Sequence, residues 1–244
     1  MKLDKTSGSA ADTQGATAGQ YAVKSASKLL WTLLAMGLIV VYCIAPLIRP
    51  HVSIGDTHDD LQAIGCDWAL VLVLALVGLV AQKRRARFFG LRAPSWRDFV
   101  AMLGVFVVTA VVVIFVTQLP VVQMTISKIR APNLIAAPFD VRLGLVLSAA
   151  ICEEFTFRGF VIEQVREWSG SLPVGAGLSL ILFVLPHAWL YGFTAALLVP
   201  AVLGASLTLL YLWRRNLPVC MVMHAAVDGY SLLLVPALMR AHGG

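Results

Sequence analysis

The decapeptide ICEEFTFRGF, residues 151–160, decides how the chain must fold. It places two carboxyl groups and one guanidinium group, those of Glu153, Glu154 and Arg158, in the middle of a long apolar run. Charged groups are costly inside a bilayer, and those that occur there usually serve a function. If the surrounding chain spans a membrane, this stretch predicts a functional site at membrane depth.

The composition predicts an integral membrane protein. Of the 244 residues, 59% are hydrophobic and 13% charged, whereas a soluble domain is roughly half apolar and a quarter charged. A helix needs about 20 apolar residues to cross a bilayer. We therefore expect an all-α, polytopic helical bundle of about seven transmembrane helices, at residues 29–48, 66–82, 98–120, 140–163, 172–192, 194–213 and 217–238.

The rest of the chain divides by composition into a tail, a helix pair, a loop and a core. Residues 1–28 are rich in Ser, Ala, Gly and Thr and predict a flexible tail. We expect two N-terminal transmembrane helices within 29–82, a basic loop at 83–97 and the functional core at 98–238. The loop is interpreted as a contact with anionic lipid and not with nucleic acid, because Lys and Arg cluster beside a membrane span.

The distribution of Lys and Arg predicts the orientation. If the tail is cytoplasmic, thirteen of the 19 basic residues lie on that side and five on the other, including Arg49, Lys128 and Arg130. Cytoplasmic loops carry an excess of such residues. We expect a multi-pass protein of a bacterial inner membrane with a cytoplasmic N-terminus.

Polar residues from three predicted helices fall at similar depth. At about 1.5 Å per residue, Glu153 lies near the middle of its span, as do His187 and the pair His224 and Asp228 in theirs. Rare polar residues at one depth indicate a common site.

Spacing predicts which of these side chains pair. Glu154 and Arg158 are i and i+4, a favourable arrangement for an ion pair, and so are His224 and Asp228. Glu153 is turned by about 100° from Glu154 around an α-helix, and is left without a local partner. Pro186 is expected to disturb the helix beside His187.

These residue types suit hydrolysis of an amide bond inside the membrane. An unpaired glutamate can act as a general base on water, with His187 opposite it. A protonated His224 can donate a hydrogen bond to the developing oxyanion.

Three motifs in order resemble those of a known family. EEFTFR (153–158) fits EExxxR, FVLPH (183–187) fits FxxxH, and HAAVD (224–228) fits HxxxN/D. These are motifs of the CPBP family, the CAAX proteases and bacteriocin-processing enzymes also called Abi. Two further stretches, 88–98 and 202–228, are similar to the family's loop and final helix pair, so the resemblance covers about residues 88–235.

The resemblance implies a glutamate intramembrane endopeptidase with a CAAX-protease-like core. By motif position, Glu153 would be the water-activating base and His187 its partner, Glu154 and Arg158 would support them, and His224 and Asp228 would line the oxyanion side. The prenyl-protein enzyme carries Asn where this chain has Asp228, and an ionised Asp would repel an oxyanion. We infer that Asp228 acts through His224. The expected partners are membrane lipids and a peptide or lipidated protein substrate, with no cofactor and no nucleic acid.

Three alternatives remain open. A zinc ion could be held by Glu153, His187, His224 and Asp228, although the chain has no His-Glu-x-x-His pair. A non-catalytic scaffold or immunity protein would use the polar groups to bind a partner. An ion-coupled carrier would use Glu153 as a proton relay, but the spans show no evident inverted repeat.

Overall fold

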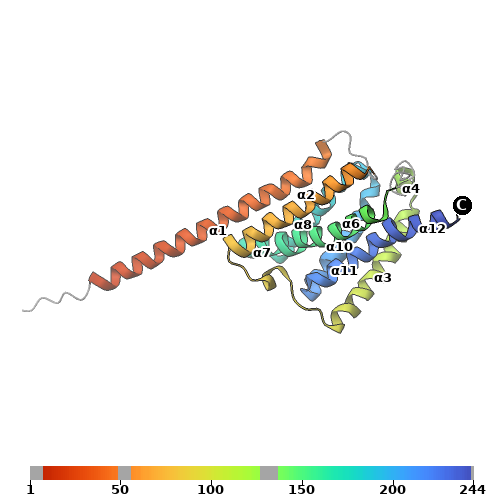
Figure 1. Cartoon of the computed structure of the whole chain (residues 1–244). Helices are drawn as coiled ribbons and strands as arrows, with labels where there is room; N and C mark the ends of the chain where they lie inside the picture. Colours follow the sequence, from red (N-terminus) through yellow and green to blue (C-terminus); the bar gives the residue numbers. More distant parts are fainter. Residues whose placement is uncertain (1–7, 49–55, 127–136, 243–244) are drawn as a thin grey trace, which may run out of the picture.

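The computed structural model describes residues 8–48, 56–126 and 137–242, and within these ranges all regular structure is helical. Five residues of the charge count lie outside these ranges: Lys2, Lys5, Arg49, Lys128 and Arg130. The elements (Figure 1) are α1 (Gly8–Ile48), α2 (Thr57–Ala75), η1 (Leu76–Ala81), η2 (Ala86–Phe89), α3 (Trp96–Gln118), α4 (Pro120–Ile126), α6 (Phe139–Ser148), η3 (Ala149–Val161), α7 (Ile162–Ser169), α8 (Leu172–Val184), η4 (Leu185–His187), α9 (Ala188–Tyr191), η5 (Ala195–Leu197), α10 (Leu198–Arg214), α11 (Leu217–Gly229), η6 (Tyr230–Leu234) and α12 (Val235–His242).

The helices form a multi-pass membrane bundle, as predicted. Six helical stretches in the described residues are long and apolar enough to cross a bilayer: 26–48, 57–81, 96–118, 172–191, 195–214 and 217–240. Large apolar side chains such as Phe115 (71% exposed) and Val108 (63%) point outward, which suits contact with lipid. The charged stretch α6–η3–α7 is the further helix that brings the arrangement close to the expected seven.

The N-terminal tail differs from the prediction. Helix α1 begins at Gly8 and not near residue 29, and its first half extends beyond the other helices (Figure 1). Residues 8–28 contain several alanines, and alanine has the highest helix propensity. The apolar run that follows nucleates a helix, and adding Ala-rich turns to an existing helix is favourable.

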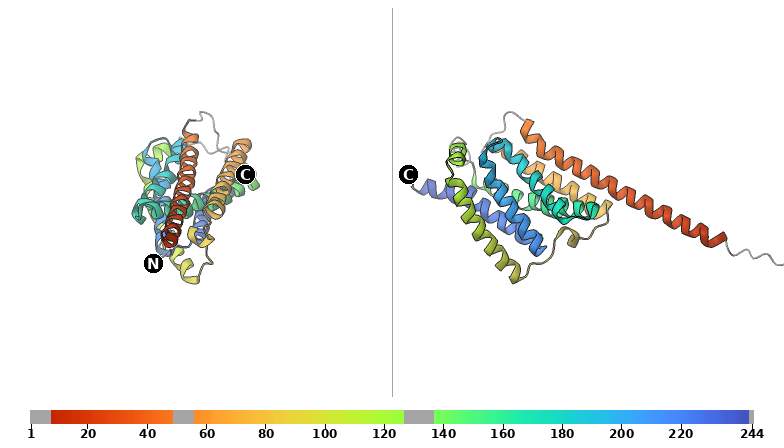
Figure 2. Two further views of the ribbon diagram at one scale, coloured as in Figure 1. Left: turned by 90° about the vertical axis from the view of Figure 1, so that its left-hand side faces the viewer. Right: turned by 180° about the vertical axis from the view of Figure 1, so that it is seen from behind.

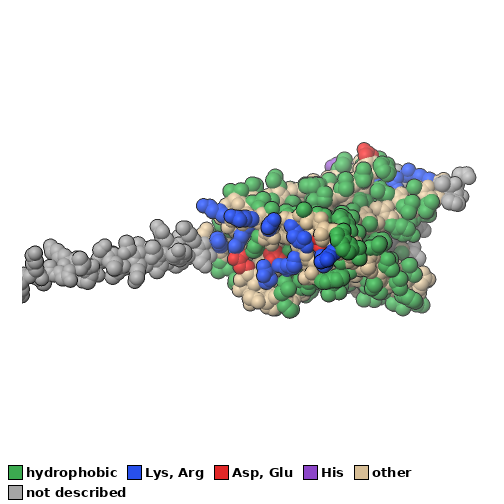
Figure 3. Space-filling view, turned by 90° about the horizontal axis from the view of Figure 1, so that it is seen from below, with side chains coloured by type: hydrophobic (Ala, Val, Ile, Leu, Met, Phe, Trp, Pro, Cys, Tyr) green, Lys and Arg blue, Asp and Glu red, His purple; other side chains and the backbone are tan. Residues whose placement is uncertain are grey.

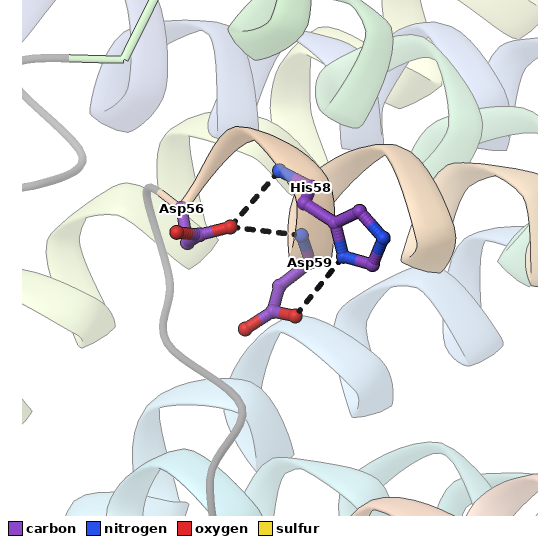
Figure 4. A group of neighbouring side chains, drawn as sticks. All are labelled: Asp56, His58 and Asp59. Atoms are coloured by element: carbon purple, nitrogen blue, oxygen red, sulfur yellow. Dashed lines mark hydrogen bonds and ion pairs between the residues drawn. The ribbon is translucent and has the colours of Figure 1, made fainter.

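Helix α2 also begins earlier than predicted, at Thr57 and not at residue 66. The Asp56 side chain accepts hydrogen bonds from the backbone N–H groups of His58 (2.9 Å) and Asp59 (3.2 Å), as Figure 4 shows. This is an N-cap, and acidic residues in the first turn suit the helix dipole. In consequence Asp67 lies ten residues inside the helix, about 15 Å from its start.

The motif glutamates lie on a π-helical segment. Element η3 covers 13 residues between α6 and α7, and ten of them are buried. π-Helices are rare in proteins, and those that do occur are often found at functional sites. Helices α2, α8 and α11 pack against η3, which therefore lies inside the bundle (Figure 2).

Ion pairs tie the elements together at one end of the bundle. Arg84, in the segment between η1 and η2, binds Glu167 of α7. At the same end, Asp98 of α3 binds Arg92 (3.1 Å) and Arg214 of α10 (2.7 Å), and Glu163 binds Arg166 (2.9 Å) and Arg215 (2.6 Å). Figure 3 shows Lys and Arg side chains gathered on one face, with acidic groups among them. Several of the residues predicted to share the cytoplasmic side thus lie together.

Candidate active site

A fully buried ion pair lies at the centre of the site. Arg158 Nη1 lies 2.7 Å from Glu154 Oε1, and neither side chain is exposed. The second nitrogen, Nη2, donates to the backbone oxygen of Gly204 on α10 (2.9 Å). The guanidinium carbon lies 4.3 Å from the centre of the Phe183 ring on α8, a cation–π distance. The predicted i, i+4 pair is present and is held by three elements.

His224 of α11 lies between the carboxyl groups of the site. Its Nδ1 is 2.9 Å from Glu154 Oε1, and because an ionised carboxylate only accepts, Nδ1 is the donor. Its Nε2 lies 3.4 Å from Asp228 Oδ2 and 4.0 Å from Glu153 Oε2. Spacing predicted the approach to Asp228 but not the bond to Glu154, because that bond joins two helices.

The angle of about 100° between neighbouring residues of an α-helix predicts that the side chains of Glu153 and Glu154 point in different directions. In the structure they do not. They approach the two nitrogens of one imidazole, that of His224. In a π-helix the hydrogen bonds run from i to i+5, so each residue turns by less than the α-helical 100°. The side chain of Glu153 is 21% exposed and that of Glu154 is fully buried. Glu153 is therefore the accessible carboxyl of the pair, while Glu154 is committed to Arg158 and His224.

His187 lies on the short helix η4. Its Nδ1 is 2.9 Å from the carbonyl oxygen of Phe183. A carbonyl oxygen only accepts, so Nδ1 carries the proton and Nε2 of the neutral ring is an acceptor. The Phe183 ring lies 5.2 Å from the His187 ring and 6.0 Å from the His224 ring, centre to centre. Pro186 lies in the 3-10 turn that interrupts α8, as expected.

Sequence reasoning missed a second polar pair beside the site. Tyr42 of α1 donates a hydrogen bond through its hydroxyl group to Asp67 Oδ1 of α2. Helix α1 packs against η4 and α2 packs against η3, the elements that carry His187 and Glu153. The sequence did contain a signal for this pair: Asp56 is a helix-capping residue, and a helix that begins after it places Asp67 well inside the membrane span. The N-terminal helices thus contribute a wall of the site.

The side chains do not converge as a metal site requires. Zinc ligands in proteins approach the ion to about 2.0–2.3 Å, so their donor atoms must lie close together. Among the described residues, Asp56, His58 and Asp59 form the one group of three candidate ligands whose donor atoms all lie within 4.8 Å of one another (Figure 4). Asp56 in this group caps α2, and both Asp56 and His58 are exposed. The alternative zinc set of Glu153, His187, His224 and Asp228 does not contain such a group among the described residues.

Comparison with known proteins finds a match to one family model. Residues 136–230 match the family model described as type II CAAX prenyl endopeptidase Rce1-like. All six motif residues lie within the match, whereas α1, α2, α3 and the loop 88–98 lie outside it. No curated protein and no solved structure matches the chain. The segment 136–230, which carries the site, is thus similar to the type II CAAX prenyl endopeptidase Rce1-like family, in agreement with the resemblance to the CAAX proteases.

Proposed function

We propose that this protein is an intramembrane endopeptidase that hydrolyses a peptide bond of a membrane-associated protein. The family supports a CAAX-type protease of the membrane. The observation that carries the proposal is the contrast between the two glutamates. Glu154 is enclosed by Arg158 and His224, while Glu153 is partly accessible beside the same imidazole. One carboxyl thus holds the site together and the other is free to act on water.

Glu153 is the general base of the proposed reaction. It takes a proton from a water molecule as the water oxygen forms a bond with the carbonyl carbon of the substrate. His187 Nε2 accepts a hydrogen bond from the same water, because its Nδ1 is occupied by Phe183. When the tetrahedral intermediate collapses, the carbon–nitrogen bond breaks and the proton on Glu153 passes to the leaving nitrogen.

His224 is the proposed donor to the oxyanion. As the carbonyl becomes tetrahedral, negative charge develops on its oxygen, and a fixed donor at that point lowers the barrier. Nδ1 of the ring is fixed by Glu154, which leaves Nε2–H to face the substrate. Asp228, 3.4 Å from Nε2, favours the protonated ring and acts through it. Arg158 acts on His224 indirectly, because it holds Glu154 in place.

The proposed substrate is a prenylated or otherwise membrane-associated protein. The name of the matching family, a CAAX prenyl endopeptidase, points to prenylated chains. We propose a bacterial inner membrane as the location, with the basic end of the bundle, which includes Arg84 and Arg92, facing the cytoplasm.

The test is cleavage by purified protein in liposomes. The substrates are a farnesylated peptide ending in a CAAX sequence and the same peptide without the lipid, with products identified by mass spectrometry. We expect Glu153→Gln to abolish cleavage while the protein still folds, because glutamine keeps the size and loses the base. Asp140→Asn, which changes an exposed carboxylate at the start of α6, is the matched control and should leave cleavage unchanged.

Three other results would redirect the assignment. If the Glu153→Gln variant cleaves at the wild-type rate, the proposed base is wrong. If chelation removes activity and zinc restores it, the metal alternative is correct in spite of the separation of the side chains. A wild-type protein that cleaves neither peptide, but transports protons or retains a partner protein, favours the carrier or the scaffold.

A further inference from the structure

An apolar groove of about 690 Å³ lies between α3 and α10, away from the glutamates. The two helices run side by side (Figure 2). Nothing in the proposed hydrolysis uses this groove. Its lining comes from one face of each helix: Trp96, Arg97, Val100, Ala101, Gly104, Val105 and Val108 of α3, and Ser206, Leu209, Trp213 and Arg214 of α10.

The length of the groove matches one leaflet of a bilayer. From Trp96 to Val108 the helix rises about 18 Å over twelve residues, and half of a hydrocarbon core is about 15 Å. Gly104 lies in the middle of this face, and a Cβ atom added there would meet no atom within 4 Å. The absence of a side chain at Gly104 therefore leaves open space at the floor of the groove.

The size of the groove favours a lipid acyl chain over an α-helix as its occupant. A volume of about 690 Å³ lies within the range of about 300–1,000 Å³ for small-molecule sites. A helix with side chains is about 10–12 Å across and would need a much larger trough. A single acyl chain fits this shape, and its methylene groups would contact Val100, Val105 and Leu209.

Positive charge lies at one end of the groove only. Arg97 and Arg214 line that end beside Trp96 and Trp213, and tryptophan is typical of the membrane–water interface. Asp98, the nearby acid, is shared between Arg92 and Arg214. Two cations thus share one anion, and Arg97 adds a further positive charge to the lining of the groove. Arg97 is exposed and forms no ion pair with any residue in the described ranges.

We propose that this groove binds one anionic glycerophospholipid of the surrounding bilayer. Its phosphate lies against Arg97 and Arg214, because guanidinium groups bind phosphate oxygens through paired N–H donors. One acyl chain runs along α3 and α10 past Gly104. The ligand is a molecule of the bilayer, so the inference does not depend on the proposed hydrolysis.

The site is placed to influence the bundle. Gly204, two residues before Ser206 on α10, accepts a hydrogen bond from Arg158, and Arg214 at the other end of the helix binds Asp98 of α3. A lipid between α3 and α10 therefore links α3 to the helix that accepts the hydrogen bond from Arg158. Anything that binds only the folded state stabilises it.

Native mass spectrometry of the detergent-purified full chain tests the proposal. Phosphatidylglycerol and phosphatidylcholine with identical acyl chains are added at equal concentration. We expect one phosphatidylglycerol to bind with clear preference. Arg97→Gln should weaken its binding about fivefold, which corresponds to about 1 kcal/mol for one basic residue near a lipid surface. Phosphatidylcholine binding should be unaffected by this change.

A second variant fills the groove without disturbing the fold. Gly104→Leu should reduce binding of both lipids, because its side chain occupies the acyl position. Gly37→Leu is the matched control: Gly37 is exposed on α1, and a Cβ atom there also meets nothing within 4 Å. It should bind like wild type.

Three results would overturn the proposal. Equal binding of the two lipids would show that Arg97 and Arg214 do not select the anionic headgroup. Wild-type binding by Gly104→Leu places the lipid elsewhere. If a farnesylated peptide displaces phosphatidylglycerol from wild type one for one, the groove holds the lipid chain of a substrate and not a bilayer lipid.

Discussion

Replacing Arg158 by methionine is expected to destabilise the protein severely. Methionine has a similar unbranched length but no charge and no donor. The change removes the 2.7 Å contact with Glu154, the 2.9 Å bond to Gly204 and the cation–π contact with Phe183. Breaking a buried pair by deleting one partner costs about 3–5 kcal/mol. The cation–π contact alone is worth about 2 kcal/mol when desolvated, so we expect a loss near the upper end of that range.

Equilibrium unfolding in mixed micelles measures this loss. Arg166→Met is the matched control, because Arg166 also pairs with a glutamate, at i−3 in the same helix, but its side chain is 43% exposed. Glu163 is buried but keeps Arg215 and Tyr211 as partners when Arg166 is removed, so we expect loss of this half-exposed arginine to cost at most about 1 kcal/mol. The two variants thus delete the same chemical group at different burial, one from η3 and one from α7, which follows η3 directly in the chain.

A double-mutant cycle decides whether the pair itself accounts for the loss. Glu154→Gln alone leaves Arg158 as an uncompensated buried charge, so it should also be costly. The double variant should cost less than the sum of the singles by about 1–3 kcal/mol, as for residues in direct contact. If the costs add to within about 0.5 kcal/mol, or if Arg166→Met costs as much as Arg158→Met, the importance given to burial is refuted.

Further predictions concern the oxyanion side and the helix packing. His224→Ala should abolish peptide cleavage while Asp228→Asn retains a substantial part of it, because Asp228 acts only through the ring; equal and complete loss in both would refute this division. Gly175→Ala should lower the free energy of unfolding by about 1–3 kcal/mol, since its new Cβ would lie 2.8 Å from the backbone oxygen of Ile162. Gly177→Ala in the same helix meets nothing within 4 Å and should cost much less in the same measurement.

Interactions within one helix could be predicted from the sequence, and those between helices could not. The Glu154–Arg158 pair and the approach of Asp228 to His224 follow from i, i+4 spacing, and both are present. The bond from His224 to Glu154 joins α11 to η3, seventy residues apart. No local spacing encodes such a bond, which depends on how the helices pack.

Errors at helix ends had consequences for the site. Counting α2 from its first continuous apolar run ignored the Asp56 cap and left Asp67 near the end of the span. Its bond to Tyr42 beside the glutamates was therefore not anticipated. Hydropathy locates the apolar middle of a helix well. Its polar ends are set by capping, which a hydropathy average does not detect.

The π-helical stretch η3 has a consequence for how this chain can vary over evolutionary time. Substitutions within residues 149–161 change one side chain, but loss of a single residue there would allow the backbone to relax to α-helical pitch. Glu153 and Glu154 would then rotate away from the imidazole between them, although both letters of the motif would still be present. The site therefore requires the length of this segment as well as its acids, and we expect a homologue with an intact EExxxR but a shortened helix to be inactive.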